Sequence, residues 1–380
     1  MTVTLREAVG SLLVVGVKGP ELTGLERAWL QLVRPGGVIL FKRNIVDAKQ
    51  TRALLDAATA MTARHSMRCV DVEGGTVNRL RDALAPLPSA QAVGTAARNA
   101  HKPALAHLHG ELIARAVKAF GFNTALAPVV DLGLPESAAV MGSRTAGISA
   151  SEVVDYARQF LAGLSAHGVV GCGKHFPGLG GGVVDSHFET PEIRRSWKRL
   201  WDDDLLPYRA LHRAMPTVMI NHAAYPETAG KNHSASASAF WITTVLRKRI
   251  GYRGLIISDD LEMAGILKFL PVDQAAIAAV RAGSDLMLIC HSPELILRTY
   301  EALIAEGERS ATFQRFLLAR ARDTARKRAR LFAHGPGPTP SAIQLEALRK
   351  RIAQFSEQVN ASAGSGDAID PRAAFPAETS

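Results

Sequence analysis

The alternation of short apolar runs with longer helical stretches limits the fold of this chain more than any other feature. Parallel sheets arise from such alternation, and strands that are apolar along their whole length are buried on both faces. Eight units of this kind favour a closed (β/α)8 barrel of the TIM type, an α/β fold, over an open sheet. The predicted strands are Ser11–Val17, Gly37–Phe41, Arg68–Val72, Thr124–Asp131, Val169–His175, Thr217–His222, Gly254–Asp259 and Asp285–Cys290.

The C-terminal part of the chain differs from the rest in composition. An Arg- and Ala-rich helical segment runs to about Ala333. Residues 335–340, GPGPTP, suit neither a helix nor a central strand. We therefore divide the chain into a barrel domain, residues 1–334, and an extension, residues 335–380. Within the extension we expect one amphipathic helix over Leu345–Val359 and a disordered tail from Asn360. Helices of the barrel are predicted at Asp47–Ala63, Ala104–Phe120, Ala150–His167, Trp197–Ala214, Ser238–Ile250 and Val272–Ala282.

Charge and cysteine content bear on partners and compartment. Lys and Arg number 45 against 35 Asp and Glu, but much of the excess lies in 320–330, which we expect to be a solvated helix face. Because no helix-turn-helix, zinc-finger or RNA-binding motif accompanies it, we expect no nucleic-acid partner. The three cysteines are far apart, which favours buried thiols in a reducing compartment. The longest early apolar run, Val9–Val17, is too short to cross a bilayer, so we expect a cytoplasmic protein with no membrane contact.

Polar residues follow five predicted strands in succession. A charged residue at the end of a buried strand is costly, and enzymes with this barrel place their active sites at the C-terminal strand ends. The sequence therefore predicts a polar active site on this face. Its candidates, in strand order, are Asp71 and Arg79, then Asp131 and Arg144, then Lys174, His175, Asp185 and His187, then Asn221 and His222, and finally Asp259 and Asp260.

The residue types at these strand ends indicate glycosyl transfer. Asp259 is placed to attack an electrophilic carbon, and His187, two residues after Asp185, suits a proton shuttle. Four donors have no partner visible in the sequence and suit the hydroxyls and the amide of a sugar: Arg79, Arg144, Lys174 and His175. A carboxylate nucleophile, an acid/base and hydroxyl-binding groups together describe retaining glycoside chemistry.

At these same residues the sequence resembles bacterial β-N-acetylglucosaminidases of glycoside hydrolase family 3. The matching blocks are GGVILFKRN at 36–44, DVEGG at 71–75, GSRT at 142–145, KHFPG at 174–178 with DSH at 185–187, and GLIISDDLEM at 254–263. The resemblance implies a single-domain barrel that removes terminal β-linked N-acetylglucosamine, typically from peptidoglycan fragments. It assigns Asp259 as nucleophile, His187 as acid/base assisted by Asp185, and Asp71, Arg79, Arg144, Lys174 and His175 as sugar-binding residues. It implies no metal and no other cofactor.

The chain departs from the family pattern at several positions. Leu179 replaces a usual His in the loop after Lys174, while Val72 and Thr76 replace a usual Gln and Arg. None of these is the nucleophile or the proton shuttle. We expect Leu179 to affect loop closure or the range of substrates.

Several alternatives remain open from the sequence. Only one of Asp259 and Asp260 can face the pocket from an extended strand, and we choose Asp259. His222 either contacts the sugar or only bonds neighbouring strand ends, and we include it among the substrate-binding residues. His107 and His109 lie on a predicted helix two positions apart, so a metal site there is not expected. A phosphorylase, a β-glucosidase and a catalytically weakened sugar-binding protein are the rival functions, and the oligomeric state is not predicted.

Overall fold

The computed structural model describes residues 3–182, 191–231, 233–335 and 337–363. Within them, eight parallel strands close a barrel in the order β1-β10-β9-β8-β7-β6-β3-β2, which confirms the predicted fold class. The strands are β1 (Leu13–Val15), β2 (Gly37–Leu40), β3 (Met67–Val70), β6 (Thr124–Ala125), β7 (Val170–Phe176), β8 (Thr217–Ile220), β9 (Leu255–Asp260) and β10 (Leu286–Ile289). A separate antiparallel hairpin of β4 (Val72–Gly74) and β5 (Val77–Asn78) follows β3.

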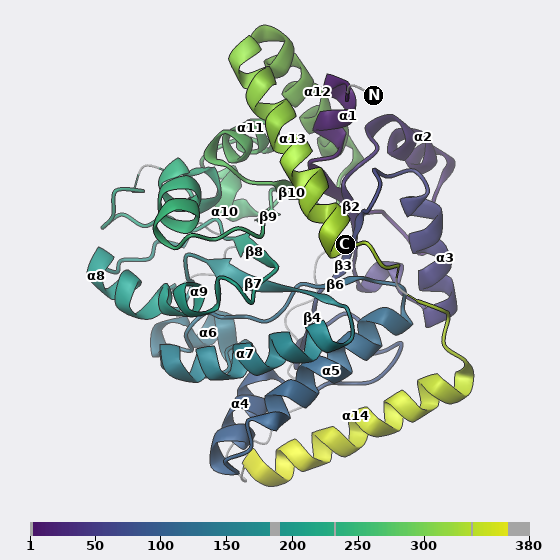
Figure 1. Ribbon diagram of the computed structural model, residues 1–380, viewed down its shortest axis with the longest axis vertical. Coiled ribbons are helices and arrows are strands. Elements are labelled where there is room, and N and C mark those ends of the chain that lie inside the picture. The colour runs from purple at the N-terminus through teal and green to yellow at the C-terminus, as the bar shows by residue number, and fades with distance from the viewer. Residues whose placement is uncertain (1–2, 183–190, 232, 336, 364–380) are drawn as a thin grey trace.

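Helices surround the barrel, and the loops after several strands carry further short helices (Figure 1). The α-helices are α1 (Leu5–Gly10), α2 (Gly24–Val33), α3 (Ala48–Thr59), α4 (Ala90–Asn99), α5 (Ala104–Ala119), α6 (Ala138–Met141), α7 (Ala150–Ala166), α8 (Trp197–Arg199), α9 (Leu206–Leu211), α10 (Ala264–Leu267), α11 (Val272–Ala282), α12 (Pro293–Arg309), α13 (Ala311–Leu331) and α14 (Ala342–Ala363). The 3-10 turns are η1 (Lys42–Asn44), η2 (Pro135–Ser137), η3 (Gly142–Arg144) and η5 (Ala235–Ala237), and the π-helices are η4 (Leu200–Asp204) and η6 (Phe240–Arg249).

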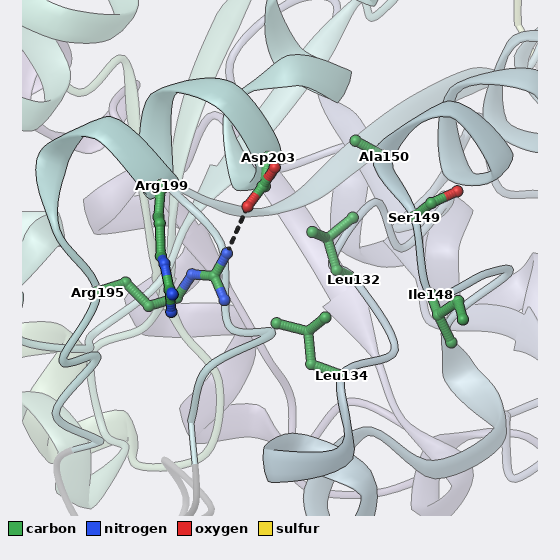
Figure 2. A pocket seen from close by; sticks show the side chains of 8 residues that line it. All are labelled: Leu132, Leu134, Ile148, Ser149, Ala150, Arg195, Arg199 and Asp203. Carbon is green, nitrogen blue, oxygen red and sulfur yellow. Dashed lines mark hydrogen bonds and ion pairs between the residues drawn. The ribbon is translucent and has the colours of Figure 1, made fainter.

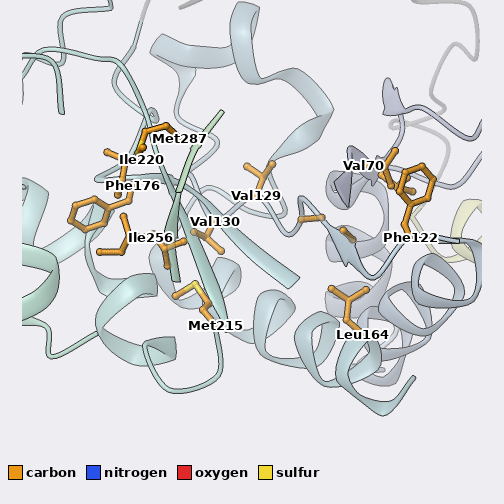
Figure 3. Close-up of a cluster of buried hydrophobic side chains, with 14 of the residues drawn as sticks. Val70, Phe122, Val129, Val130, Leu164, Phe176, Met215, Ile220, Ile256 and Met287 are labelled. Carbon is orange, nitrogen blue, oxygen red and sulfur yellow. The ribbon is translucent and has the colours of Figure 1, made fainter. Parts of the chain in front are cut away.

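Two apolar layers hold the barrel. Side chains of a strand alternate between its faces, so every second residue points into the barrel and the others meet the helices. The interior is filled by residues that include Cys69, Cys172 and Ile257. The outer layer lies between strands and helices; Figure 3 shows part of it, with Val70, Ile220 and other aliphatic side chains near Phe122 and Phe176. Strands buried on both faces explain why the predicted runs lack polar alternation.

The predicted helix Trp197–Ala214 is instead three consecutive pieces, α8, η4 and α9. Pro207 lies in the first turn of α9, where a missing N–H costs least, so the earlier helix ends before it. Helix η6 begins two residues after the predicted Ser238. The overall helix positions otherwise follow the expected pattern.

Helix α14 is longer than the predicted Leu345–Val359 and lies along the outside of α4 and α5 (Figure 1). It buries Leu348, Ile352, Phe355 and Val359, which recur every three or four residues on one face. The first residues of the predicted disordered tail, up to Ala363, are therefore helical, while residues 364–380 lie outside the described part of the chain. The division at residue 334 stays a prediction.

The basic stretch 320–330 is not simply a solvated helix face, contrary to expectation. Asp285, fully buried where β10 begins, lies 3.1 Å from both Arg320 and Lys327 and 2.6 Å from Arg247. Arg328 is 2% exposed and donates to the Gly36 carbonyl at 2.8 Å. A buried carboxylate needs cationic partners, and α13 supplies two of them. Among the described helices, none has the length and apolar content needed to cross a membrane.

Candidate active site

Three charged residues sit at the C-terminal strand ends, each two positions after a residue of the barrel interior. Asp71, Lys174 and Asp259 come two residues after Cys69, Cys172 and Ile257, which face the barrel interior. Burial raises the pKa of the Cys172 thiol to about 12, and the charges of Lys174, Asp71 and Asp259 also act on that thiol. Groups from β3, β7 and β9 therefore converge over one buried sulfur, although 188 residues separate the first from the last.

Glu73 links two of the predicted sugar-binding residues. It lies on the β4–β5 hairpin, is 3% exposed, and accepts from Arg144 Nε and Nη2, each at 2.8 Å. Its Oε1 also lies 2.7 Å from Lys174 Nζ, and that ammonium donates to Asp71 Oδ1 at 2.8 Å. Two carboxylates and two cations thus form one buried cluster on this face of the barrel.

The cluster keeps Glu73, Lys174 and Arg144 ionised. Burial alone would favour neutral Glu73, but Arg144 and Lys174 outweigh it and hold the pKa of this carboxyl well below its usual range. Burial opposes the charge of Lys174 too, and Asp71 and Glu73 reverse that effect, so the Lys174 pKa is raised. The same opposition of burial and Glu73 raises the pKa of Arg144. At neutral pH the site therefore offers fixed charges rather than proton donors.

His175 is oriented by a second buried carboxylate. Its Nδ1 lies 2.7 Å from Asp131 Oδ2, and its Nε2 lies 3.4 Å from Arg144 Nη2. Because a guanidinium N–H only donates, this arrangement assigns the ring proton to Nδ1 and leaves Nε2 as the acceptor. The peptide bonds before His175 and Pro177 are cis.

The β4–β5 hairpin reverses the chain and brings Arg79 back beside Asp71. Its backbone N–H donates to the Asp71 carbonyl at 3.0 Å, and its guanidinium carbon lies 5.9 Å from the centroid of the Phe41 ring. Gly74 and Gly75, with φ of +92° and +60°, make the turn that allows this return. The hairpin therefore brings Asp71, Glu73 and Arg79 to one strand end.

Three of the donors for which the sequence shows no partner have a carboxylate partner in the structure. Lys174, Arg144 and His175 are all engaged by buried carboxylates. Burying a charged donor without a partner costs several kcal/mol, roughly, so the fold provides one for each. These donors are preoriented before any sugar arrives.

The two adjacent aspartates after Ile257 have different surroundings. Asp259 Oδ1 accepts from the Asp260 backbone N–H at 2.9 Å. Asp260 Oδ1 accepts from the Glu262 N–H at 3.1 Å and its Oδ2 lies 3.3 Å from His291 Nε2. Asp260 therefore orders the turn that precedes α10, and the choice of Asp259 as the carboxylate that faces the pocket stays a prediction.

His222 bonds neighbouring protein groups. It is 1% exposed, with Nδ1 2.7 Å from Ser236 Oγ and Nε2 2.8 Å from the Asp260 carbonyl. Both ring nitrogens already have protein partners, so of the two alternatives for His222 the geometry favours bonding between strand ends.

His109, likewise, is buried on α5 with Nδ1 2.9 Å from Tyr156 Oη, and burial lowers its pKa to about 3. Its ring packs against Phe160 and Phe355, which makes it a core residue.

The loop after β7 is only partly described. Asp185 and His187, the predicted acid/base pair, lie outside the described residues. In the part of this loop that the structure describes, Leu179 is 7% exposed and packs within the main apolar core. Leu179 therefore fills a core position, where the family's usual His would have to be buried.

One group of described residues has metal-ligand geometry. Asp260, Glu262 and His291 each place a ligand atom within 4.8 Å of the others. However, the Glu262 carboxylate accepts from the backbone N–H groups of Cys290, His291 and Ser292, at 2.8, 2.5 and 2.9 Å. Holding the chain after β10 accounts for this carboxylate without an ion.

A cavity of about 330 Å³ lies beside the strand ends, between the loop after β6 and the helices after β7 (Figure 2). Arg195 forms ion pairs with Asp203 and Asp204 there, each at 2.9 Å, and burial raises the pKa of Asp204 to about 7. None of the described residues predicted for catalysis or sugar binding lines it. The lining residues are Leu132, Leu134, Ile148, Ser149, Ala150, Arg195, Arg199 and Asp203.

From the sequence alone, Glu73 was not among the candidates, and Asp131 was a strand-end candidate without a specific role. Both were visible as acidic residues in or after apolar runs. What could have found them is the rule that each buried cation needs a buried anion, applied to Lys174 and Arg144.

Comparison with known proteins places these residues in a family context. The profile described as "Glycosyl hydrolase family 3 N terminal domain" matches residues 4–318. A beta-hexosaminidase of Stenotrophomonas maltophilia is 37% identical over 288 residues, 75% of this chain and 84% of the relative. A beta-hexosaminidase of Alkalilimnicola ehrlichii is 38% identical, over 75% of this chain and 82% of the relative.

Solved structures are similar as well. A family 3 β-N-acetylglucosaminidase from Paenibacillus superposes with a TM-score of 0.83 at 29% identity, covering 94% of this chain and 69% of that one. NagZ from Neisseria gonorrhoeae, in complex with N-trifluoroacetyl-D-glucosamine, gives 0.75 at 27% identity, covering 92% of this chain and 98% of that one.

Proposed function

The chain belongs to glycosyl hydrolase family 3 and is a β-N-acetylhexosaminidase, and from this premise we propose that it removes terminal β-linked N-acetylglucosamine with retention of configuration. The observation that carries the proposal is the cluster at the strand ends, in which Lys174 Nζ lies 2.8 Å from Asp71 and 2.7 Å from Glu73. The charges of Lys174, Asp71 and Asp259 also all act on the buried Cys172 thiol. A carboxylate beside fixed hydroxyl-binding charges suits attack on an anomeric carbon.

In the proposed reaction Asp259 attacks the anomeric carbon while His187, assisted by Asp185, protonates the leaving oxygen. The bond to the aglycone breaks and a covalent glycosyl–enzyme forms. His187 then removes a proton from the incoming water, whose oxygen attacks the anomeric carbon, breaks the bond to Asp259 and releases the free sugar. Asp71, Arg79, Arg144, Lys174 and His175 hold the sugar. The roles of His187 and Asp185 rest on their spacing in the sequence, DSH at 185–187.

We propose peptidoglycan fragments as the natural substrates. Support comes from the family resemblance of the sequence and from the N-acetylglucosamine analogue bound in the Neisseria structure.

Turnover of nitrophenyl β-N-acetylglucosaminide and of the matching glucoside, with and without phosphate, tests the activity. We expect hydrolysis of the N-acetylglucosaminide and free sugar in both buffers. Faster cleavage of the glucoside would overturn the substrate assignment. Sugar 1-phosphate as the product in phosphate buffer would instead identify a phosphorylase, because a neutral imidazole does not repel an anionic acceptor.

The nucleophile is tested by trapping the intermediate with a fluorosugar and sequencing the labelled peptide. Asp259 should carry the label, Asp259→Ala should abolish turnover, and the matched variant Asp260→Asn should still be labelled. A label on Asp260, or turnover by Asp259→Ala equal to that of the wild type, would refute the mechanism.

A further inference from the structure

The segment from His175 to Leu179 covers the end of β7 and the start of the loop that follows it. Buried groups from two neighbouring strand ends hold this segment. After β6, Asp131 Oδ2 accepts from the His175 backbone N–H at 3.0 Å, and Oδ1 accepts from the Leu179 N–H at 2.8 Å. After β8, Tyr225 Oη donates to the Gly178 carbonyl at 2.7 Å. The chain is thus fixed at both ends of a five-residue segment.

The two buried anchors belong to a connected network. Asn221 Nδ2 donates to the His175 carbonyl and to Tyr225 Oη, each at 2.9 Å. The side chain of Asp131 and the residue Tyr225 are both fully buried. Hydrogen bonds among buried groups are costly to leave unmade, so this network has one favoured arrangement.

The geometry explains why position 131 carries an acid and not an amide. The His175 and Leu179 backbone N–H groups donate to different oxygens of Asp131. An asparagine has only one oxygen, so its NH2 group would face one of these two backbone donors in either orientation. The second oxygen of the carboxylate is what reaches the loop while the first orients the His175 ring.

We propose that Asp131 and Tyr225 are positioning residues that couple the sugar-binding His175 to the loop carrying the acid/base. This rests on the proposed function, because His187 follows Leu179 by eight residues. Both anchors act on main-chain atoms of Gly178 and Leu179, so the family's usual His at position 179 is not needed for them. The Leu179 side chain, in the apolar core, adds to the same attachment.

Substrates whose leaving groups differ in acidity distinguish a positioning role of Asp131 and Tyr225 from a purely structural role. A 2,4-dinitrophenyl group departs without protonation, whereas a phenyl group needs the general acid. Displacing the start of the loop therefore slows phenyl β-N-acetylglucosaminide more than the dinitrophenyl glycoside. Displacing His175 weakens sugar binding equally for both, which inhibition by N-acetylglucosamine measures directly.

Asp131→Asn should lower kcat/KM for the phenyl glycoside by about 10²-fold, since a misplacement of about 1 Å has that effect. It should also raise the inhibition constant of N-acetylglucosamine. Tyr225→Phe removes the bond to the Gly178 carbonyl and the acceptor for Asn221 Nδ2, but it leaves the Asp131–His175 contact in place. It should lower phenyl turnover roughly tenfold, with the inhibition constant unchanged. In both variants the dinitrophenyl glycoside should be affected less.

Matched controls lie at the other end of the barrel. Tyr252 is fully buried and donates to the Leu255 carbonyl at 3.0 Å, so Tyr252→Phe removes an equivalent bond far from the strand ends that carry the site. Asp285→Asn is the control for Asp131→Asn, because Asp285 is also a buried carboxylate that accepts from a backbone N–H. Its other partners are the partly buried cations Arg247, Arg320 and Lys327. Both controls should lower the melting temperature and leave the ratio of phenyl to dinitrophenyl turnover at its wild-type value.

Wild-type protein without activity on either glycoside would refute the proposed function itself. If the wild type is active, a ratio of phenyl to dinitrophenyl turnover that is the same in Tyr225→Phe and Tyr252→Phe would overturn the positioning proposal. An equal ratio in Asp131→Asn and Asp285→Asn would overturn it as well. If Asp131→Asn fails to fold, the pair of tyrosine variants decides.

Discussion

Replacing Glu73 with glutamine removes one negative charge from the buried cluster that it shares with Lys174, Arg144 and Asp71. The carboxylate lies 2.7 Å from Lys174 Nζ and 2.8 Å from Arg144 Nε and Nη2. Glutamine keeps the shape but offers one oxygen, and its NH2 group faces a cation. Charge-assisted hydrogen bonds contribute about 1.5–3 kcal/mol each, and breaking one partner of a buried ion pair costs about 3–5 kcal/mol. We therefore expect a loss of about 3–5 kcal/mol in the free energy of unfolding at pH 7.

The loss should depend on pH with a definite sign. The folded-state pKa of Glu73 lies well below its unfolded value of 4.5, so its stabilisation is fully present above pH 4.5 and declines as pH falls. Each unit below the unfolded pKa removes about 1.4 kcal/mol, so the difference between wild type and Glu73→Gln should shrink by about 2 kcal/mol from pH 5 to pH 3.

Urea unfolding of both proteins at pH 7, 5 and 3 measures this difference. Glu301→Gln is a surface control, because its pair with Arg6 is half-exposed on both sides and should contribute little. A loss below about 1 kcal/mol at pH 7, the range of surface pairs, would refute the assignment of Glu73 as the ionised centre of the cluster. A difference that stays constant down to pH 3 would refute it as well.

Three further substitutions test the packing. Leu179→His should cost about 1–3 kcal/mol of unfolding free energy, because it buries an imidazole among apolar side chains; an unchanged urea midpoint would show that the site accepts a polar group. Phe355→Ala should cost about 3–5 kcal/mol if α14 is part of the core, whereas a loss below about 1 kcal/mol would show that α14 is dispensable. Gly36→Ala would place a Cβ 2.2 Å from the Ser11 carbonyl oxygen, so we expect a lower melting temperature, and an unchanged one would contradict this close approach.

The barrel was predictable because its signal is local. Each strand is a short apolar run, and the order of runs and helices along the chain leaves few alternatives to a parallel barrel. The same applies to Asp71, Lys174 and Asp259, which reveal themselves as charges at the ends of buried strands. The sequence blocks around these three residues are also sufficient to indicate the family.

The partners of these residues were not predictable, since they lie far away in the sequence. Lys174 and Asp71 are 103 residues apart, and His175 and Asp131 are 44 apart. Glu73 sits on a hairpin whose direction depends on how β3 is paired. The burial of Arg328 and the pairing of Lys327 with Asp285 likewise depend on where α13 packs, so composition alone indicated a solvated face.

The amino-acid order by itself determined the type of fold, the face of the barrel that carries chemistry and the family. Tertiary structure decided which charges neutralise one another, which of two neighbouring aspartates orders the turn before α10, and how firmly the segment after β7 is attached. The physical reason is that hydrophobic periodicity acts within a few residues. An ion pair or a buried hydrogen bond, in contrast, forms only after closure of the barrel brings donor and acceptor atoms from distant strand ends within about 3 Å of each other.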